Sequence, residues 1–288
     1  VWMMDASGEN AKESRRGVPT PMTSFYKLSG LCSCFPHHPR IGKYYMCAHP
    51  WDQAEQIEIV SGAFCMLRRR ALEDVGLLDE DFFMYGEDID LSYRILKAGW
   101  ENWYLPYKML HYKGESTEKS SFRYVHVFYE AMLIFYRKHF RHFNILVNIP
   151  VQTAICVKAF QALVSMQLHK MRKSLGFVTP SVRRDPLFVV FVSASSQSVC
   201  EDIITFNGLN AEVHVVSQWN EVQNIVSEIL MSHLSPLYIV FDTQQCSYQK
   251  VFDLVNSQPS QCLVGWLDAD AQLIITSKDV FTSDSAHT

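Results

Sequence analysis

The hydrophobic pattern along the chain becomes regular only after its first fifth. Residues 9–56 show little periodicity and are rich in Pro, Gly and aromatic residues, which predicts long ordered surface loops. Before them, "VWMMDASGE" reads as the end of a strand followed by a turn. From Ile57, "IEIVSGAFCMLRR" predicts a strand broken at Ser61-Gly62, and "RALEDVGLLDEDF" predicts a short helix that ends near Gly76.

The segment "DFFMYGEDIDLSYR" at residues 81–94 crowds carboxylates beside a Phe-Phe-Met-Tyr block. Apolar residues then recur with helical spacing, which predicts a helix whose first turn holds Glu87 and Asp88 and which Gly99 ends. The run "NWYLPYKMLHY" predicts one strand that ends at His111.

Two apolar segments follow. "FRYVHVFYEAMLIFYRKHF" predicts a long helix with an N-cap at Ser120 or Ser121, and "NILVNIPVQTAICVKAFQALVSMQL" is interrupted by Pro150 and Lys158. The basic, proline-containing link at 176–186 indicates a domain boundary.

Beyond this link the pattern alternates between short β-rich runs and helical stretches. "LFVVFVSA", "AEVHVVS", "LYIVFDT" and "CLVGWLD" are the predicted strands, and this alternation is typical of a parallel α/β sheet. We therefore expect three parts: residues 1–122, a pair of amphipathic basic helices at 123–176, and a Rossmann-like α/β domain at 187–288.

Composition adds limits to this picture. The 288 residues are 48% hydrophobic and 13% aromatic, as in globular proteins with a sizeable core, and the net charge of −4 gives no argument for nucleic-acid binding. Eight scattered cysteines favour reduced thiols in a cytosolic setting. "CSCFPHH" is too compact for four zinc ligands, so a loop ending at Pro36 is the preferred interpretation.

The carboxylates at the helix start have two interpretations. Glu87 and Asp88 could simply complement the helix dipole. Alternatively, apolar walls and a helix N-terminus tune a carboxylate for proton transfer, and His111 at the end of the next strand would converge with Asp88 in a metal-assisted transfer.

A resemblance favours the second interpretation. "SGAFCMLRRRALEDVGLLDEDFFMYGEDIDLSYRILKAGWENWYLP" followed by "HYKGEST" resembles the C-terminal half of the catalytic domain of family-two inverting glycosyltransferases, closest to the bacterial rhamnosyltransferase-like branch. The resemblance runs from about Trp2 to Phe140, and "ESRRGVPTP" and "FYEAMLIFYRKHF" fit the same branch. It implies a partial GT-A-like domain and a role in cell-surface polysaccharide synthesis.

The resemblance also implies roles for particular residues. Asp88 would be the general base that activates an acceptor hydroxyl, with Glu87 as its neighbour or as an acceptor-positioning group. His111 would be a ligand of a divalent metal, Mg or Mn, that neutralises the leaving diphosphate. The turn Ser61-Gly62-Ala63 would lie on the acceptor side, and Lys113 or Ser116 would touch phosphate.

The sequence departs from the family in one large respect. The family binds its nucleotide sugar with an N-terminal half that ends in an Asp-X-Asp motif, and no such half stands before Val1. The late "DAD" at 268–270 lies in another domain and is not that motif. We therefore expect an acceptor half and a base without a complete donor site. The alternative is a non-catalytic binding or regulatory remnant. A glycoside hydrolase fits less well, because Glu87 and Asp88 are sequence neighbours and cannot flank a bond.

The expected partners are a nucleotide-sugar donor and a lipid-linked or oligosaccharide acceptor, without nucleic acid. Residues 123–173 carry eight Lys or Arg against the single acid Glu130. This composition leaves two interpretations open, a basic helix on an anionic membrane surface and a buried helix with a solvated basic face. The expected location is the cytoplasm, with peripheral attachment to the inner face of the cytoplasmic membrane as the first of these interpretations.

Overall fold

The computed structural model describes residues 1–112, 122–140, 145–174, 186–231, 237–259 and 261–283. The chain forms two compact units, and each is considered by itself. Unit 1 comprises residues 1–2, 12–107 and 116–179, and unit 2 comprises residues 3–11, 108–115 and 180–288. Both units mix helices and strands, so the predicted α/β class is confirmed at this level.

Unit 1 is mainly helical around one small antiparallel pair of strands. Strand β2 (Glu55–Ile57) pairs with β3 (Asn102–Tyr104). The helical elements of this unit, apart from the two described next, are the following: η1 (Lys12–Ser14), α1 (Pro21–Leu28), α2 (Leu31–Cys34), η2 (Gly42–Tyr44), α3 (Arg69–Val75) and α4 (Glu87–Lys97).

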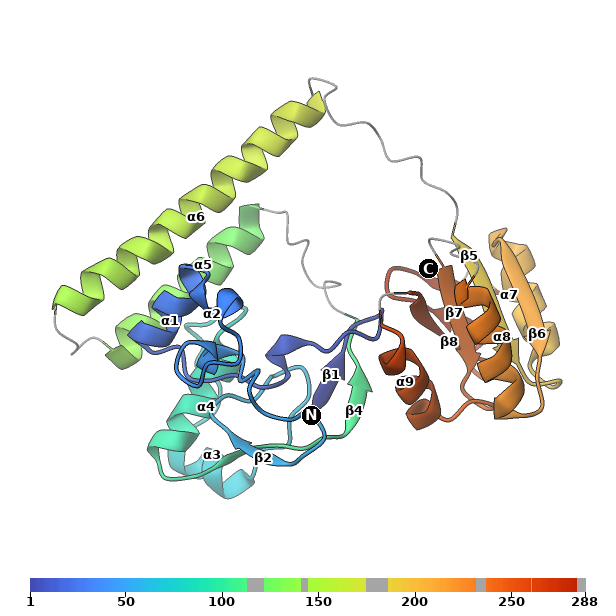
Figure 1. Ribbon diagram of the computed structural model, residues 1–288, viewed down its shortest axis with the longest axis horizontal. Coiled ribbons are helices and arrows are strands. Elements are labelled where there is room, and N and C mark those ends of the chain that lie inside the picture. The colour runs from blue at the N-terminus through green and yellow to red at the C-terminus, as the bar shows by residue number, and fades with distance from the viewer. Residues whose placement is uncertain (113–121, 141–144, 175–185, 232–236, 260, 284–288) are drawn as a thin grey trace. The chain divides into compact units, whose positions relative to one another are not determined.

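Two long helices complete unit 1, α5 (Phe122–Phe140) and α6 (Ile145–Ser174). They lie side by side in Figure 1, and α6 also contacts α1. Aromatic residues of α5 fill the core against the loop before α4 and the segment near Ile59. The buried members of this cluster are Val18, Ile59, Phe82, Ala131, Phe135, Tyr136, Phe140 and Ile155.

A buried charge cluster ties α4 to α5. Asp90 has no exposed surface, and its carboxylate lies 2.7 Å from Arg94 Nε, 2.8 Å from Lys138 Nζ and 2.6 Å from His139 Nε2. Burial alone would raise the pKa of Asp90, but the hydrogen bonds from these three groups outweigh it and hold that pKa far below its ordinary value. The start of α4 is therefore fixed to α5 by charge as well as by apolar packing.

Unit 2 is built on a six-stranded sheet in the order β10-β9-β8-β7-β5-β6. The four strands β5 (Leu187–Val192), β6 (Ala211–Val215), β7 (Leu237–Asp242) and β8 (Leu263–Asp268) pair in parallel, while β9 (Leu273–Ile275) and β10 (Val280–Thr282) extend the edge in antiparallel fashion. A separate pair joins β1 (Trp2–Met4) to β4 (Lys108–Leu110).

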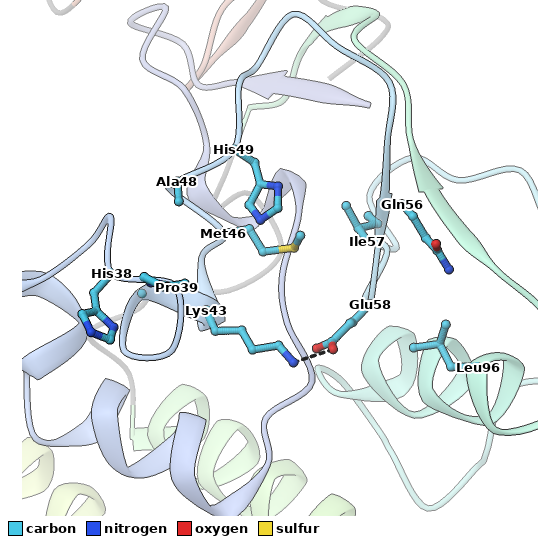
Figure 2. Close-up of a pocket in the computed structure, with 11 residues that line it drawn as sticks. His38, Pro39, Lys43, Met46, Ala48, His49, Gln56, Ile57, Glu58 and Leu96 are labelled. Atoms are coloured by element: carbon cyan, nitrogen blue, oxygen red, sulfur yellow. Dashed lines mark ion pairs between the residues drawn. The ribbon is translucent and has the colours of Figure 1, made fainter.

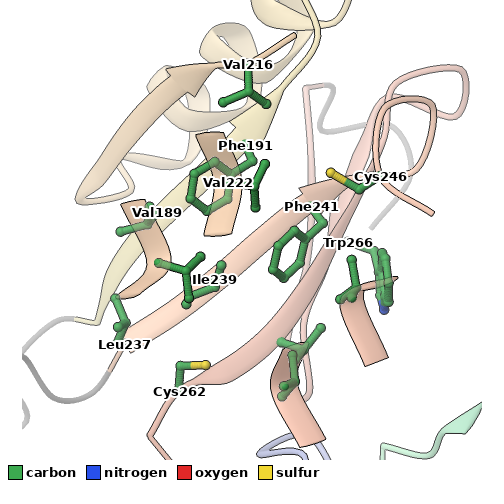
Figure 3. Packing of buried hydrophobic residues seen from close by; sticks show 14 residues of the cluster. Val189, Phe191, Val216, Val222, Leu237, Ile239, Phe241, Cys246, Cys262 and Trp266 are labelled. Carbon is green, nitrogen blue, oxygen red and sulfur yellow. The ribbon is translucent and has the colours of Figure 1, made fainter. Parts of the chain in front are cut away.

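Helices cover both faces of this sheet. On one face, α8 (Trp219–Met231) and α9 (Tyr248–Ser257) pack on Phe191, Ile239 and Phe241 (Figure 3). On the other face, α7 (Gln197–Asn207) packs on Val190 and Val240. Strands buried on both faces read as continuous apolar runs, which is why the sequence identified β5, β7 and β8 correctly.

The structure corrects three sequence-based expectations about elements. The predicted strand from Asn102 to His111 is two strands, β3 and β4, which pair with different partners on either side of Pro106, a residue without a backbone N–H. Residues 9–56 are not loops throughout, because α1 begins at Pro21 with Thr20 as its N-cap. "CSCFPHH" starts inside the short helix α2.

The two compact units also group residues differently from the three parts expected. Helices α5 and α6 belong to unit 1, where they complete its core. Residues 3–11 and 108–115 belong to unit 2, because Tyr112 donates a hydrogen bond to the Val264 carbonyl and the Val264 N–H donates to the Ala6 carbonyl. The proposed N-caps Ser120 and Ser121 lie outside the described residues.

Candidate active site

Asp88 stands in the first turn of α4 with both carboxylate oxygens engaged. Its Oδ2 accepts hydrogen bonds from Arg16 Nη2 at 2.5 Å and from the Gly62 backbone N–H at 3.0 Å, and its Oδ1 accepts from the Ile89 N–H at 2.8 Å. The Asp88 side chain is 17% exposed, so solvent can reach the carboxylate. Three chain segments that are distant in sequence thus meet on one carboxylate.

Arg16 is placed by the backbone on either side of it. Its carbonyl accepts the Ile59 N–H at 2.9 Å in an isolated antiparallel bridge, and the Gly17 N–H donates to the Tyr44 carbonyl at 3.0 Å. Burial disfavours the guanidinium charge, but Asp88 outweighs that cost and raises the pKa of Arg16. The guanidinium is therefore charged whenever Asp88 is ionised.

Gly62 lies directly against the carboxylate. A Cβ at this position would stand 3.2 Å from the Cβ of Asp88, which is tighter than ordinary van der Waals contact. Of its neighbours in the predicted acceptor-side turn, Ser61 is buried and Ala63 is exposed. The structure therefore brings the turn and the predicted base together at Gly62.

Glu87 is chemically different from its neighbour. Its Oε2 is buried and has no hydrogen-bond partner among the described residues. Burial, and secondarily the charge of Asp88, raise the pKa of Glu87 above its ordinary value. A carboxyl group of this kind binds a proton more readily than an ordinary one.

The backbone before α4 explains how the pair is presented. Gly86, the N-cap, has φ of 91°, and Tyr85 has φ of 66°. A Cβ at Gly86 would meet the Phe82 ring at 3.0 Å, so glycine serves both the left-handed conformation and the close approach. After this turn, α4 begins with its two acidic residues, next to the apolar cluster that includes Ala131.

The remaining predicted site residues belong to unit 2 or lie outside the described residues. His111 belongs to unit 2, where its N–H donates to the Met4 carbonyl and its buried Nδ1 has no partner among the described residues. Lys113 and Ser116 lie outside the described residues. The predicted convergence of His111 with Asp88 therefore stays a prediction.

The described residues also do not form a set that fits a divalent ion. Nowhere in the described part of the chain do three or more His, Cys, Asp or Glu side chains lie together as metal ligands would. His111 lacks such companions there, and we assign it no chemical step.

A cavity of about 490 Å³ opens elsewhere in unit 1 (Figure 2). Lys43 Nζ and Glu58 Oε1, which lie 2.7 Å apart, line it together with the apolar side chains of Met46, Ile57 and Leu96. None of the described predicted-site residues lines it. Glu58 nevertheless borders the site, because its Oε2 accepts the Val18 N–H at 2.6 Å, two residues after Arg16.

Sequence reasoning missed Arg16. The stretch "ESRRGVPTP" was part of the family resemblance, yet nothing in its local pattern distinguishes Arg16 from Arg15. Arg15 is completely buried, with its guanidinium over the Trp51 and Tyr104 rings and donating to the carbonyls of Pro50 and His49. Only the tertiary structure assigns one arginine to packing and the other to the carboxylate.

Comparison with known proteins covers the same region. Residues 44–166 match the family described as "Glycosyl transferase family group 2". Two curated relatives, from Mycobacterium tuberculosis strains CDC 1551 / Oshkosh and ATCC 25618 / H37Rv, are each an "N-acetylglucosaminyl-diphospho-decaprenol L-rhamnosyltransferase", and each is 39% identical over 109 residues. The alignment covers 34% of this chain and 35% of each relative.

The chain thus spans about a third of the length of the curated relatives it matches. No solved structure matches it. The matched residues include Glu87, Asp88 and the Ser61-Gly62-Ala63 turn, and the resemblance noted in the sequence is confirmed. Residues 44–166 are therefore similar to family-two glycosyltransferases, and the curated relatives with which the chain aligns are rhamnosyltransferases.

Proposed function

We propose that this chain is the acceptor-side part of a glycosyltransferase that moves a sugar from a nucleotide-diphosphate donor to a hydroxyl group during cell-surface polysaccharide synthesis. The observation that carries the proposal is the Asp88 carboxylate, held against Gly62 at the start of α4 inside the matched segment. The relatives are named as rhamnosyltransferases that act on a lipid-linked diphospho sugar, and we propose the same class of acceptor here.

The chemistry follows from the weakness of a hydroxyl nucleophile near neutral pH. As the acceptor oxygen forms a bond to the anomeric carbon, its proton passes to the Asp88 carboxylate. The bond between that carbon and the diphosphate oxygen breaks on the opposite face, and the nucleotide diphosphate leaves with the electron pair. Attack opposite the leaving group inverts the anomeric configuration.

Asp88 has the geometry for this role, and Glu87 has a different one. Asp88 is oriented by three donors and partly exposed, whereas the Oε2 of Glu87 beside it is buried. Glu87 is the proposed neighbour or acceptor-positioning group, a role that rests on the resemblance. Ser61 and Ala63, with Lys113 or Ser116 on phosphate, complete the proposed acceptor side.

The finer fold assignments belong to the same proposal. A partial GT-A-like arrangement in unit 1 is supported by the family match over 44–166. A Rossmann-like character for residues 187–288 is supported by the parallel order β6-β5-β7-β8 with helices on both faces. Family-two enzymes commonly use a divalent metal, which would neutralise the leaving diphosphate, and a role for His111 in holding it rests on the resemblance alone.

A peripheral membrane location is also proposed, on the evidence of α6. This helix packs against α5 and α1, yet it leaves an apolar stripe exposed at spacings of three and four residues. The stripe consists of Val157, Phe160, Val164, Leu168 and Met171. The sequence of α6 contains four cations and no Asp or Glu, which suits an anionic lipid surface. Among the described residues, no helix has the length and apolar run needed to cross a bilayer.

A transfer assay tests the proposed activity. The full chain is incubated with radiolabelled nucleotide sugars, nucleotide-activated rhamnose among them, and with a polyprenyl-diphosphate N-acetylglucosamine acceptor, and labelled lipid is extracted. In parallel, residues 44–166 replace the matching segment of a mycobacterial relative. Labelled product in either arm, lost on Asp88→Asn, supports the proposal. A folded chimaera that binds acceptor without transferring sugar would instead favour a non-catalytic binding role.

A further inference from the structure

The structure places an arginine on the proposed base, from a segment 72 residues away in sequence. Arg16 Nη2 and Asp88 Oδ2 are 2.5 Å apart, and the two side chains are only 14% and 17% exposed. Ion pairs between fully exposed groups contribute little and are screened by salt, but a partly buried charge pair at hydrogen-bond distance holds both groups in one geometry.

The support of this pair is continuous through the backbone. The Ile59 N–H donates to the Arg16 carbonyl, and Ile59 precedes the Ser61-Gly62 turn by two residues. The same turn supplies the Gly62 N–H to Asp88 Oδ2. Arg16 and Gly62 are thus carried by two bridged segments and converge on one oxygen, which fixes the carboxylate's rotation and leaves its charge in place.

We propose that Arg16 is a positioning residue for the general base: it holds the Asp88 carboxylate in one orientation, without touching the sugar itself. The inference rests on the proposed function, because it assigns Asp88 the role of base. It differs from a purely structural ion pair in one respect: loss of Arg16 slows the transfer step through Asp88, in addition to any change in stability.

Glu87, Cys65 and Tyr44 are three titratable groups that interact with Asp88 or Arg16. Glu87 lies beside it on α4, and the Cys65 thiol, whose pKa is raised by burial first and by Asp88 second, lies on the loop after Gly62. Both interact unfavourably with a charged Asp88. The Tyr44 hydroxyl hydrogen-bonds to Arg16 and supports the cation. Arg16 is therefore the favourable charge in this set.

The test compares Arg16→Gln and Arg16→Lys with a matched control, Arg69→Gln, which removes one cation of an exposed pair with Glu73. Initial rates of sugar transfer give kcat and the KM values of each variant, and urea unfolding gives its stability. We expect Arg16→Gln to lower kcat by about 10- to 100-fold with little change in KM, because a misplaced catalytic group slows the reaction by such factors. Arg16→Lys should lower kcat less, and Arg69→Gln should leave it unchanged.

The same substitutions are made in an Asp88→Asn background. Because Arg16 acts through Asp88, Arg16→Gln should lower kcat little further there, and the two substitutions should also be non-additive in the free energy of unfolding. Additive effects on stability would overturn the Arg16–Asp88 coupling, whatever the transfer assay gives. Unchanged kcat in folded Arg16→Gln would overturn the role in catalysis. Absence of transfer in the parent chain would count against the proposed function, while the unfolding cycle would still judge the Arg16–Asp88 pair.

Discussion

At the scale of single residues, the two neighbouring acids of "GEDIDLSYR" have different surroundings. Asp88 accepts hydrogen bonds from Arg16 and from the Gly62 and Ile89 N–H groups, which fix the orientation of its carboxylate. Glu87 has a buried Oε2 without a partner among the described residues, and burial raises the pKa of Glu87. The pair therefore presents one oriented, partly exposed carboxylate and one partly buried carboxyl group beside it.

A first prediction follows for this pair. In a preparation with measurable transfer, Asp88→Asn should lower kcat by roughly 10²–10⁴, the usual contribution of general base catalysis, and should leave donor binding intact. Glu87→Gln should mainly raise the KM for the acceptor. Initial rates at varied acceptor concentration separate the two effects. Full turnover in Asp88→Asn with loss in Glu87→Gln would reverse the assignment within the pair.

At the scale of elements, α4 carries the site and α5 holds α4. Asp90 is the link, since its carboxylate pairs with Lys138 and His139 of α5. Lys138 also bonds Asp79 in the loop before α4, and this hydrogen bond lowers the pKa of Asp79. Part of the cationic character of α5 is therefore used inside unit 1, in pairs with these two acidic residues.

The second prediction concerns this link. Asp90→Asn should lower the free energy of unfolding at pH 7 by about 1.5–3 kcal/mol, because Arg94, Lys138 and His139 lose a charged hydrogen-bond acceptor while Lys138 keeps Asp79. Since the folded-state pKa of Asp90 lies below the unfolded one, the stabilisation is complete above about pH 4, the unfolded value, and is lost as pH falls below it. The variant should therefore lose less stability than the parent on acidification.

Urea unfolding followed by tryptophan fluorescence at pH 7 and pH 3.5 measures both quantities. Glu73→Gln, which breaks the exposed pair with Arg69, is the control and should change stability by about 1 kcal/mol or less. Equal acid sensitivity of Asp90→Asn and the parent would show that other carboxylates dominate the acid transition.

The third prediction belongs to α6. Phe160→Ser with Leu168→Ser should lower partitioning onto vesicles that contain anionic lipid by about tenfold or more. Each fully buried side chain of this size contributes about 1.5–3 kcal/mol, and 1.4 kcal/mol is a factor of ten. The matched control replaces two exposed leucines elsewhere in unit 1, Leu77 and Leu78, by Ser. Co-sedimentation measures the partitioning of each form.

Added salt should weaken the binding of the parent, because surface charges are screened beyond about 8–10 Å at ordinary ionic strength. Equal binding to neutral vesicles would remove the electrostatic part of the proposal. Concentration-dependent dimerisation abolished by the same two substitutions, without lipid binding, would identify the stripe as a contact between two copies of the chain.

At the scale of the whole molecule, the chain is organised as two compact units whose boundaries do not follow the sequence. Residues 3–11 and 108–115 contribute to unit 2 although the residues between them build unit 1. Lys108 pairs with Asp253, and Asn256 donates to the Gly8 carbonyl, so segments from the first half of the chain complete unit 2. A cut at the linker 176–186 would therefore leave unit 2 without part of its structure.

Much of the architecture could be read from the sequence because it depends on local pattern. Apolar strands buried on both faces, the helical spacing after Gly86 and the glycine that ends α3 are short-range signals, and these particular elements are present as predicted. The strand predicted from Ile57 to the Ser61-Gly62 break is not, because β2 ends at Ile57 and only Ile59 forms a further, isolated bridge. The family resemblance identified the acidic pair and the Ser61-Gly62-Ala63 turn for the same reason, since both are contiguous stretches. The antiparallel strands β9 and β10 were not anticipated, because three residues are too few to show a period.

The tertiary structure decided what depends on contacts between distant residues. Arg15 and Arg16 are adjacent and chemically identical, and only the bridge to Ile59 directs Arg16 to Asp88 while Arg15 enters an aromatic core. Likewise, Asp88 and Glu87 are adjacent, yet Asp88 accepts three hydrogen bonds whereas an oxygen of Glu87 is buried without a partner among the described residues. Sequence pattern fixes which residues are near each other along the chain, whereas ionisation depends on what surrounds a group in space.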